Sequence, residues 1–213
     1  MPASPDQTPP ATVVVIDDDG HVREALGGLF RSVGLRVEVF ASVRDYTSSA
    51  VVDAPGCLVL DVRLPGQSGL DFFDERRGSG SLPPVIFISG HADVQMSVRA
   101  IKAGAIDFFT KPVRDQDLLD AVQIAIERDR ARRDEARRTA EVRAGHASLT
   151  PREREIMGLV VSGLRNKQIA AACGLTEASV KFHRGHLMRK MGAESLVDLV
   201  RMSDLLKAGS PGE

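Results

Sequence analysis

The chain has 213 residues, of which 43% are hydrophobic and 27% are charged, and its formal net charge is −1. These ordinary values exclude a wholly disordered chain, a collagen-like fibre and a disulfide scaffold, and no run of 18 apolar residues predicts a membrane span. Residues 1–10 lack the basic start of a signal peptide and the two cysteines lie far apart, so we expect reduced thiols and a cytoplasmic protein.

Charge divides the chain into two halves. Residues 1–125 hold 11 basic and 17 acidic side chains, whereas residues 126–213 hold 17 basic and 12 acidic ones. This asymmetry predicts two modules, of which the second contacts a polyanion. The expected organisation is a disordered tail at 1–10, an α/β domain at 11–125, a helical linker at 126–145, an all-helical domain at 146–208 and a second tail at 209–213.

The first half alternates between strand and helix patterns. Short apolar runs rich in β-branched residues predict buried strands, and apolar residues at helical spacing predict helices between them. The runs lie at 13–16, 35–40, 58–60, 85–88 and 106–109. Helical spacing occurs at 22–33, where two glycines weaken the pattern, and at 94–103. This alternation predicts a doubly wound α/β fold around a five-stranded parallel sheet.

From Asp115 onward the pattern becomes helical, and between residues 127 and 138 it becomes strongly charged. Asp129 and Arg133 are spaced for an i,i+4 ion pair, which contributes only ~0.2–0.5 kcal/mol to a helix. Because this stretch lacks a heptad seam, we predict a polar connecting helix that runs to about Ala144 rather than a coiled coil.

Capping signals divide the remaining residues into short helices. Thr150 followed by Pro151 begins the first, Asn166 is the expected cap of the second, and Thr176 caps the third. A fourth covers about 194–206. The second and third helices, joined by a three-residue turn, have helix-turn-helix spacing.

Charged and polar side chains follow the predicted strands of the first half: Asp17, Asp18, Asp61, Ser89 and Lys111. Each alone is more typical of a solvated turn, but the carboxyl ends of parallel strands converge on one crevice. Three crowded carboxylates repel unless a hard cation such as Mg²⁺ lies among them. A metal-bound Asp61 could then attack a phosphoryl group, with Lys111 and Ser89 binding its oxygens.

Four segments of the first half together resemble a response-regulator receiver domain: Val14–Asp19, Leu58–Gly69, Val85–Gly90 and Asp107–Pro112. With its second half, the chain resembles a FixJ-type regulator of the NarL/FixJ group over about residues 11–207. The resemblance implies a flavodoxin-like receiver in which Asp61 accepts the phosphoryl group. It also implies that Mg²⁺, or Mn²⁺, is held by Asp17, Asp18, Asp61 and the backbone carbonyl of Arg63.

The resemblance further implies a switch. Ser89 would move to meet the phosphoryl group, and Phe108 would fill the space that it leaves. The Lys111–Pro112 peptide would be cis, while Arg63 and His91 would flank the phosphate and tune its loss. A changed surface would then pair with another receiver. The apolar residues Val113, Leu118 and Val122 either contribute to that contact or pack in the core.

The second half resembles the LuxR-type DNA-binding domain in Leu149–Glu155, Gly163–Ala170, Val180–Arg184 and Lys190–Gly192. Lys181 and Phe182 sit where relatives contact base edges, and Gly185 allows close approach at a cost of roughly 1 kcal/mol in helix propensity. The histidines at 183 and 186 also suit a metal, but no third ligand adjoins them in the sequence. The expected DNA contacts are Lys167, Thr176, Ser179, Lys181, Phe182, His183, Arg184 and Arg189.

The combined expectation is a transcriptional response regulator rather than a metabolic enzyme. A sensor histidine kinase would phosphorylate Asp61, and the protein would then bind an imperfect DNA palindrome as a dimer and activate transcription through RNA polymerase, without contacting a membrane. Two alternatives are a phosphate sink that binds DNA weakly and a DNA-binding regulator that ignores phosphorylation. The basic cluster at 181–184 disfavours the first, and the complete acidic pocket disfavours the second.

Overall fold

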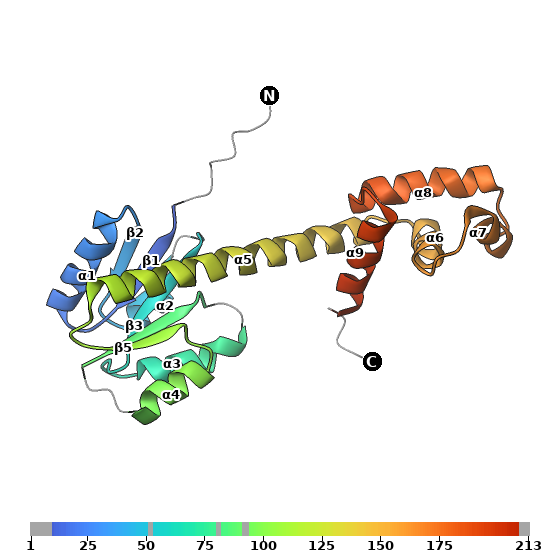
Figure 1. Cartoon of the computed structure of the whole chain (residues 1–213). Helices are drawn as coiled ribbons and strands as arrows, with labels where there is room; N and C mark the ends of the chain where they lie inside the picture. The colour runs from blue at the N-terminus through green and yellow to red at the C-terminus, as the bar shows by residue number, and fades with distance from the viewer. Residues whose placement is uncertain (1–9, 51–52, 80–81, 91–93, 209–213) are drawn as a thin grey trace. The chain divides into compact units, whose positions relative to one another are not determined.

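A computed structural model of the chain describes residues 10–50, 53–79, 82–90 and 94–208 (Figure 1). His91 and nearly all of the two predicted tails therefore lie outside the described residues. The chain divides into two compact units, residues 1–133 and 134–213. The boundary lies inside the predicted linker, because the first turns of that linker pack against the α/β unit.

The first unit is built on a parallel sheet, as the sequence predicts. Its strands are β1 (Thr12–Ile16), β2 (Arg36–Phe40), β3 (Gly56–Asp61), β4 (Val85–Ser89) and β5 (Asp107–Thr110), in the spatial order β2-β1-β3-β4-β5. All neighbouring strands pair in parallel. The apolar strands β1, β3 and β4 are buried along their whole length, because helices cover both faces of the sheet.

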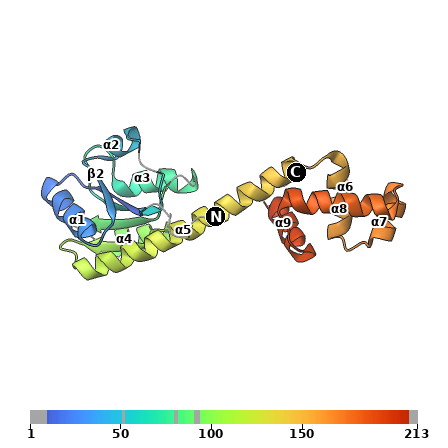
Figure 2. The ribbon, with the colours of Figure 1, turned by 90° about the horizontal axis from the view of Figure 1, so that it is seen from above.

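Two apolar cores lie on opposite faces of this sheet, and Figure 2 views from above the helices that cover it. The elements on one face are α2 (Val43–Ser48), α3 (Gly69–Arg76), the 3₁₀ turn η1 (Arg77–Ser79) and α4 (Val94–Lys102); those on the other are α1 (Gly20–Ser32) and the start of α5 (Asp115–Ala147). Leu118 and Val122 of α5 are each 1% exposed in the second core, and Val113 packs against it. Of the two roles considered for these three residues, contact with a partner or packing in the core, the structure shows packing in the core of the first unit.

Helix α5 is longer than the predicted linker at both ends. It begins at Asp115, and it continues to Ala147 rather than to about Ala144. Near its far end Val142 is buried in the core of the second unit. The heptad-free charged stretch is therefore the middle of one helix whose two ends belong to the two units, and it is mostly exposed apart from the buried Asp129.

The second unit contains α6 (Pro151–Val161), α7 (Asn166–Cys173), α8 (Glu177–Met191) and α9 (Leu196–Ala208). Thr150 caps α6 as predicted, in a reciprocal capping box with Glu153. The prediction that Asn166 caps α7 is wrong: Arg165 is the capping residue, and its N–H donates to the side chain of Gln168 at 2.9 Å. The Asn166 side chain instead accepts a hydrogen bond from α8.

Both cysteines are free thiols, and Cys57 is fully buried in the sheet, where burial raises its pKa. Within the described ranges, none of the helices has the length and apolarity needed to cross a membrane.

Candidate functional site

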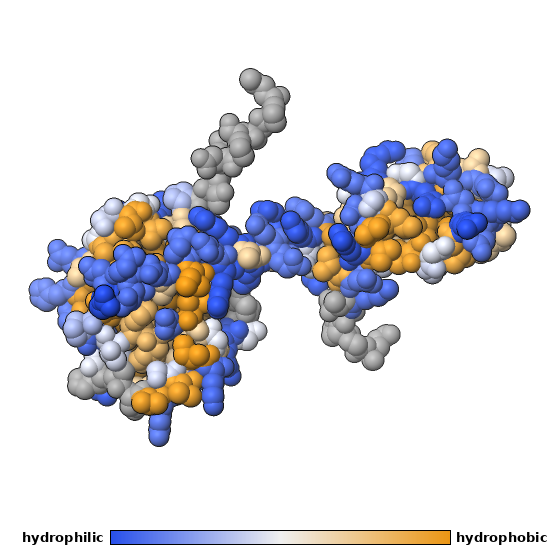
Figure 3. Space-filling view, viewed as in Figure 1, coloured by the Kyte–Doolittle hydropathy of each residue, from blue (hydrophilic) through white to orange (hydrophobic). Residues whose placement is uncertain are grey.

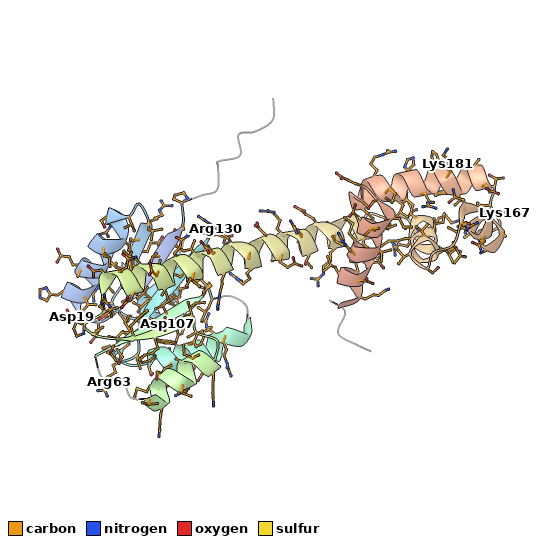
Figure 4. The ribbon with its side chains drawn as sticks, viewed as in Figure 1. Asp19, Arg63, Asp107, Arg130, Lys167 and Lys181 are labelled. Atoms are coloured by element: carbon orange, nitrogen blue, oxygen red, sulfur yellow. The ribbon has the colours of Figure 1, made fainter. Side chains whose placement is uncertain are left out.

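The side chains predicted to converge do follow the strand ends. Asp17 comes directly after β1, Asp61 and Ser89 are the last residues of β3 and β4, and Lys111 follows β5. Because β1, β3, β4 and β5 are neighbours and run in parallel, their carboxyl ends form one edge of the sheet. Figure 4 labels two neighbours of these residues, Asp19 and Arg63, at the same edge.

Lys111 joins the two buried carboxylates. Its Nζ lies 2.6 Å from Oδ2 of Asp17 and 2.6 Å from Oδ2 of Asp61. The other oxygen of each carboxylate accepts a backbone N–H, at 3.0 Å from Asp19 and at 2.9 Å from Arg63. The carboxylate of Asp17 is fully buried and Asp61 is 5% exposed. These contacts fix the orientation of both carboxylates toward the lysine.

Burial and charge act against each other in this cluster. Burial raises the pKa of Asp17, and the hydrogen bonds from Lys111 and Asp19 oppose that rise without cancelling it. Burial works to lower the pKa of Lys111, but its hydrogen bonds to the two carboxylates outweigh burial and leave the pKa raised. The lysine is therefore held as an ammonium ion.

The carboxylates also fit a divalent cation. Asp17, Asp18 and Asp61 each offer an oxygen, and these atoms lie within 4.8 Å of one another. Three carboxylates with one ammonium leave a formal excess of two negative charges, which a cation such as Mg²⁺ balances with the oxygen ligands that it prefers. Over the described parts of the chain no other group of acidic, histidine or cysteine residues is so placed, and His183 and His186 gain no third ligand.

The two predicted switch residues lie on the neighbouring strands β4 and β5, two positions apart in the register, since Phe108 pairs with Phe87 and Ser89 pairs with Thr110. Ser89 is buried, and its backbone oxygen accepts the N–H of Lys111 at 2.8 Å. Phe108 is half-buried, with its ring centroid 6.3 Å from that of Phe87. The Lys111–Pro112 peptide is cis, which confirms the expectation from the resemblance. The backbone thus connects the lysine directly to the strand that carries Ser89.

An open groove leads to the acidic cluster. It has a volume of about 750 Å³, and its lining includes Asp18, Arg63 and residues of α3 and α4. Arg99 of α4 crosses it and donates to Asp71 at 2.9 Å and to Asp74 at 2.6 Å on α3. Sequence reasoning missed this contact, because the partners are 25 or more residues apart and no local pattern connects them.

A second candidate site lies on α7 and α8. Val180, Leu187 and Met191 bury one face of α8. On the exposed part of the helix lie Lys181 and Phe182, the latter 63% exposed. Figure 4 marks Lys181 on α8 and Lys167 on α7. Lys167 and Arg189 are exposed as well, so these predicted DNA contacts are accessible, while His183 and Arg184 are half-buried.

Three of the predicted DNA contacts also form hydrogen bonds within the second unit. Thr176 caps α8 by accepting the N–H of Ser179 at 3.1 Å, and the hydroxyl oxygens of the two residues are 2.9 Å apart. Arg184 donates from Nη1 to Oδ1 of Asn166 at 2.6 Å and so ties α8 to α7. This hydrogen bond holds the two helices of the helix-turn-helix together.

Both units match known families. Residues 13–123 match the family described as response regulator receiver domain, and residues 147–203 match bacterial regulatory proteins of the luxR family. Nodulation protein W of Bradyrhizobium diazoefficiens is 53% identical over 196 residues, covering 92% of this chain and 86% of that protein. Response regulator protein TodT of Pseudomonas putida is 45% identical over 197 residues, covering 92% of this chain and 87% of that protein.

Solved structures agree with these matches. The low-resolution structure of response regulator StyR matches with a TM-score of 0.83 and 39% identity, covering 92% of this chain and 98% of that one. Full-length FixJ from B. japonicum matches with a TM-score of 0.54 and 33% identity, covering 93% of this chain and 98% of that one. The chain therefore belongs to the two-component response regulators of the NarL/FixJ group, transcription regulators that join a receiver domain to a LuxR-family DNA-binding domain.

Proposed function

We propose that a sensor histidine kinase phosphorylates Asp61 and that the modified protein binds DNA as a dimer and activates transcription. The observation that carries this proposal is the placement of Asp61 and Asp17 on one ammonium group, 2.6 Å from each, beside a groove open to solvent. An oxygen of Asp61 forms the new bond to phosphorus while the bond from phosphorus to the donor breaks.

The residues around Asp61 have separate tasks in this transfer. Lys111 gives up its hydrogen bond to one of its two carboxylate partners and pairs with the oxygens of the incoming phosphoryl group. The hydroxyl of Ser89 donates to another of these oxygens, and Phe108 moves into the space that Ser89 leaves. Asp17, Asp18, Asp61 and the carbonyl of Arg63 would hold Mg²⁺ (or Mn²⁺), which would supply positive charge to balance these groups and the phosphoryl oxygens.

The proposed dimer surface is on α4. Val94, Val98 and Ile101 are 79%, 44% and 47% exposed, which is unusual for neighbouring large apolar residues on one helix. Figure 3 shows apolar surface at the lower edge of the first unit, where α4 lies. Phosphorylation would change this surface through Phe108 and favour pairing with a second copy.

The DNA contacts follow from the second unit. Lys181 and Phe182 of α8 would contact base edges in the major groove. Backbone phosphates would be bound by Lys167, Thr176, Ser179, Arg184 and Arg189, and His183 would be a further DNA contact. A dimer would place two such helices on an imperfect palindrome. Bound there, it would act on RNA polymerase, and it would do so in the cytoplasm, where the DNA lies.

The test is the selection of bound sequences from a random DNA duplex library at fixed salt, with and without beryllofluoride and Mg²⁺. We expect an imperfect palindrome that is enriched only with the phosphoryl analogue, and no analogue effect in Asp61→Asn. Asp45→Asn, which changes an exposed carboxylate on α2, is the control and should behave as the unmodified chain. Equal enrichment in both conditions would contradict control by phosphorylation, and no enrichment would favour a phosphate sink.

A further inference from the structure

Gly185 occupies the middle of helix α8, where a glycine is costly. Apart from proline, glycine is the least favourable residue in a helix interior, because it loses the most backbone freedom when it is ordered. The helix runs without interruption from Glu177 to Met191. Gly28 in α1 and Gly158 in α6 also lack a neighbour that would exclude a side chain, so the location of Gly185, and not its cost alone, must show what its missing side chain is for.

The chain itself provides no reason for a missing side chain at this position. The backbone of Gly185 is not in the left-handed region, and a Cβ atom built there would meet no atom within 4 Å. Other glycines differ: a Cβ at Gly56 would lie 2.0 Å from a backbone oxygen of Thr12, and one at Gly145 would lie 2.8 Å from that of Lys190. Packing of the described residues explains those glycines but leaves Gly185 unexplained.

Gly185 lies on the outer face of α8. The buried residues Val180, Leu187 and Met191 define the inner face, and with about 100° of rotation per residue Gly185 points away from them. Phe182 and Arg189, three residues before and four residues after it, share its side of the helix and are exposed. The missing side chain therefore leaves a gap on the surface that is available to a partner.

Two rings border this gap. The ring of Phe182 packs against that of His186, with centroids 4.4 Å apart and the planes tilted by 44°. Because the contact joins residues one turn apart, it holds the Phe182 ring close to the helix surface beside Gly185. The cations Lys181 and Arg189 are exposed on the same helix, so the surface is complementary to a polyanion.

We propose that Gly185 is the point of closest approach between α8 and the floor of the DNA major groove. The absence of a Cβ lets the helix backbone lie against base edges, and the rings beside the gap contact them from one side. This inference rests on the proposed DNA-binding function, and it adds that recognition at this point depends on shape rather than on a hydrogen-bonding side chain.

The test compares two glycine substitutions in the full chain. Gly185→Ala is the test variant. Gly158→Ala is the control, because Gly158 also lies within a helix, α6, is exposed, and would place its Cβ more than 4 Å from any other atom. Removing an exposed helical glycine should raise the melting temperature of the second unit by about 4 °C in each variant.

Binding to DNA should separate the two variants. The duplex is the palindrome selected with the unmodified chain, and affinity is measured with beryllofluoride and Mg²⁺ at fixed salt. We expect Gly185→Ala to lose about tenfold or more in affinity for it, as a disrupted base pair does, while binding to random duplex is retained. Gly158→Ala should bind both duplexes as the unmodified chain does.

Three results would overturn the inference. Gly185→Ala could bind the selected duplex as tightly as the control variant, which would show that no close approach occurs there. It could lower the melting temperature, which would place the reason for the glycine inside the fold. If the unmodified chain selected no duplex at all, the proposed function itself would fail, and that outcome is distinguishable because it precedes any comparison of variants.

Discussion

Strand β3 begins beside one buried carboxylate and ends with another, and the two have opposite surroundings. At its first residue, the N–H of Gly56 donates to Asp129 of α5 at 3.0 Å. At its last residue, Asp61 shares the ammonium of Lys111 with Asp17. Both ends are buried, so the environment of each carboxylate decides what it can do.

The Asp129 carboxylate has a full set of partners. Besides the N–H of Gly56, it accepts hydrogen bonds from Arg132 at 2.6 Å and from Arg133 at 2.8 Å, and Arg133 also pairs with Asp53. Two carboxylates thus face two guanidinium groups, and the formal charges cancel. Because these charges already cancel, the cluster does not need a bound ion. Its hydrogen bonds fasten α5 to the sheet.

The cluster at the other end has too few cations. Three carboxylates lie together with one ammonium ion, which pairs with two of them, and Asp17 is held in a buried position where its pKa is raised. An imbalance of this kind costs stability unless a ligand relieves it. The comparison indicates that charge balance, rather than burial, separates the carboxylate that fastens a helix from the carboxylates that we propose bind an ion and accept a phosphoryl group.

The largest expected effect comes from the balanced cluster. Asp129→Ala removes the acceptor of the buried N–H of Gly56 and one carboxylate partner of Arg132 and of Arg133, so it should lower the free energy of unfolding of the first unit by about 3 kcal/mol. Urea unfolding followed by circular dichroism measures this. Asp134→Ala is the control, since Asp134 pairs with Arg137 in full exposure on the same helix and should change stability by less than about 0.5 kcal/mol. Equal losses would show that the burial of Asp129 is unimportant.

The sequence predicted that the side chains of the acidic cluster converge, and it missed the balanced cluster. Asp17, Asp61 and Lys111 follow apolar strands directly, and the parallel topology alone brings such residues together. For Asp129, the only signal in the sequence was its i,i+4 spacing from Arg133, which is typical of an ion pair on the surface. Its burial depends on Gly56, 73 residues earlier, and local patterns contain no information about a contact of that range.

The helix caps of the second unit also show that local contacts can be predicted from the sequence and long-range contacts cannot. Thr150 and Thr176 cap their helices as predicted, because an N-cap needs only the residues that follow it. Asn166 has an equally favourable side chain, but it accepts the hydrogen bond of Arg184 from another helix. A tertiary contact therefore displaced a local preference, and the sequence of α7 alone could not reveal it.

A fourth buried carboxylate, Glu153, tests whether a carboxylate with balanced partners also acts in a stabilising role in the second unit. It accepts from Lys190 at 2.7 Å and from the N–H of Thr150 at 2.8 Å, and chiefly the bond from Lys190 lowers its pKa to about 2. Because the folded pKa lies below the ordinary value of 4.5, this stabilisation is complete above that value and is lost as the pH falls toward about 2.

Glu153→Gln should therefore destabilise the second unit by about 1.5 kcal/mol at neutral pH, the contribution of a hydrogen bond between charged groups. The same variant should reduce the loss of stability between pH 4.5 and pH 2. Thermal unfolding across this pH range measures both effects. An unchanged pH profile in the variant would show that another carboxylate governs the acid sensitivity of the unit.

The smallest expected effect comes from the unbalanced cluster, and there the direction matters more than the size. Removal of one carboxylate by Asp18→Asn relieves repulsion, so without metal the variant should be at least as stable as the unmodified chain, in contrast to Asp129→Ala. Mg²⁺ at about ten times its dissociation constant should stabilise the unmodified chain by about 1.4 kcal/mol, and EDTA should reverse this. Asp18→Asn should lose most of that stabilisation. If Asp18→Asn instead destabilised the metal-free protein as Asp129→Ala does, the two ends of β3 would not differ in charge balance, and the distinction between a fastening carboxylate and a binding one would fail.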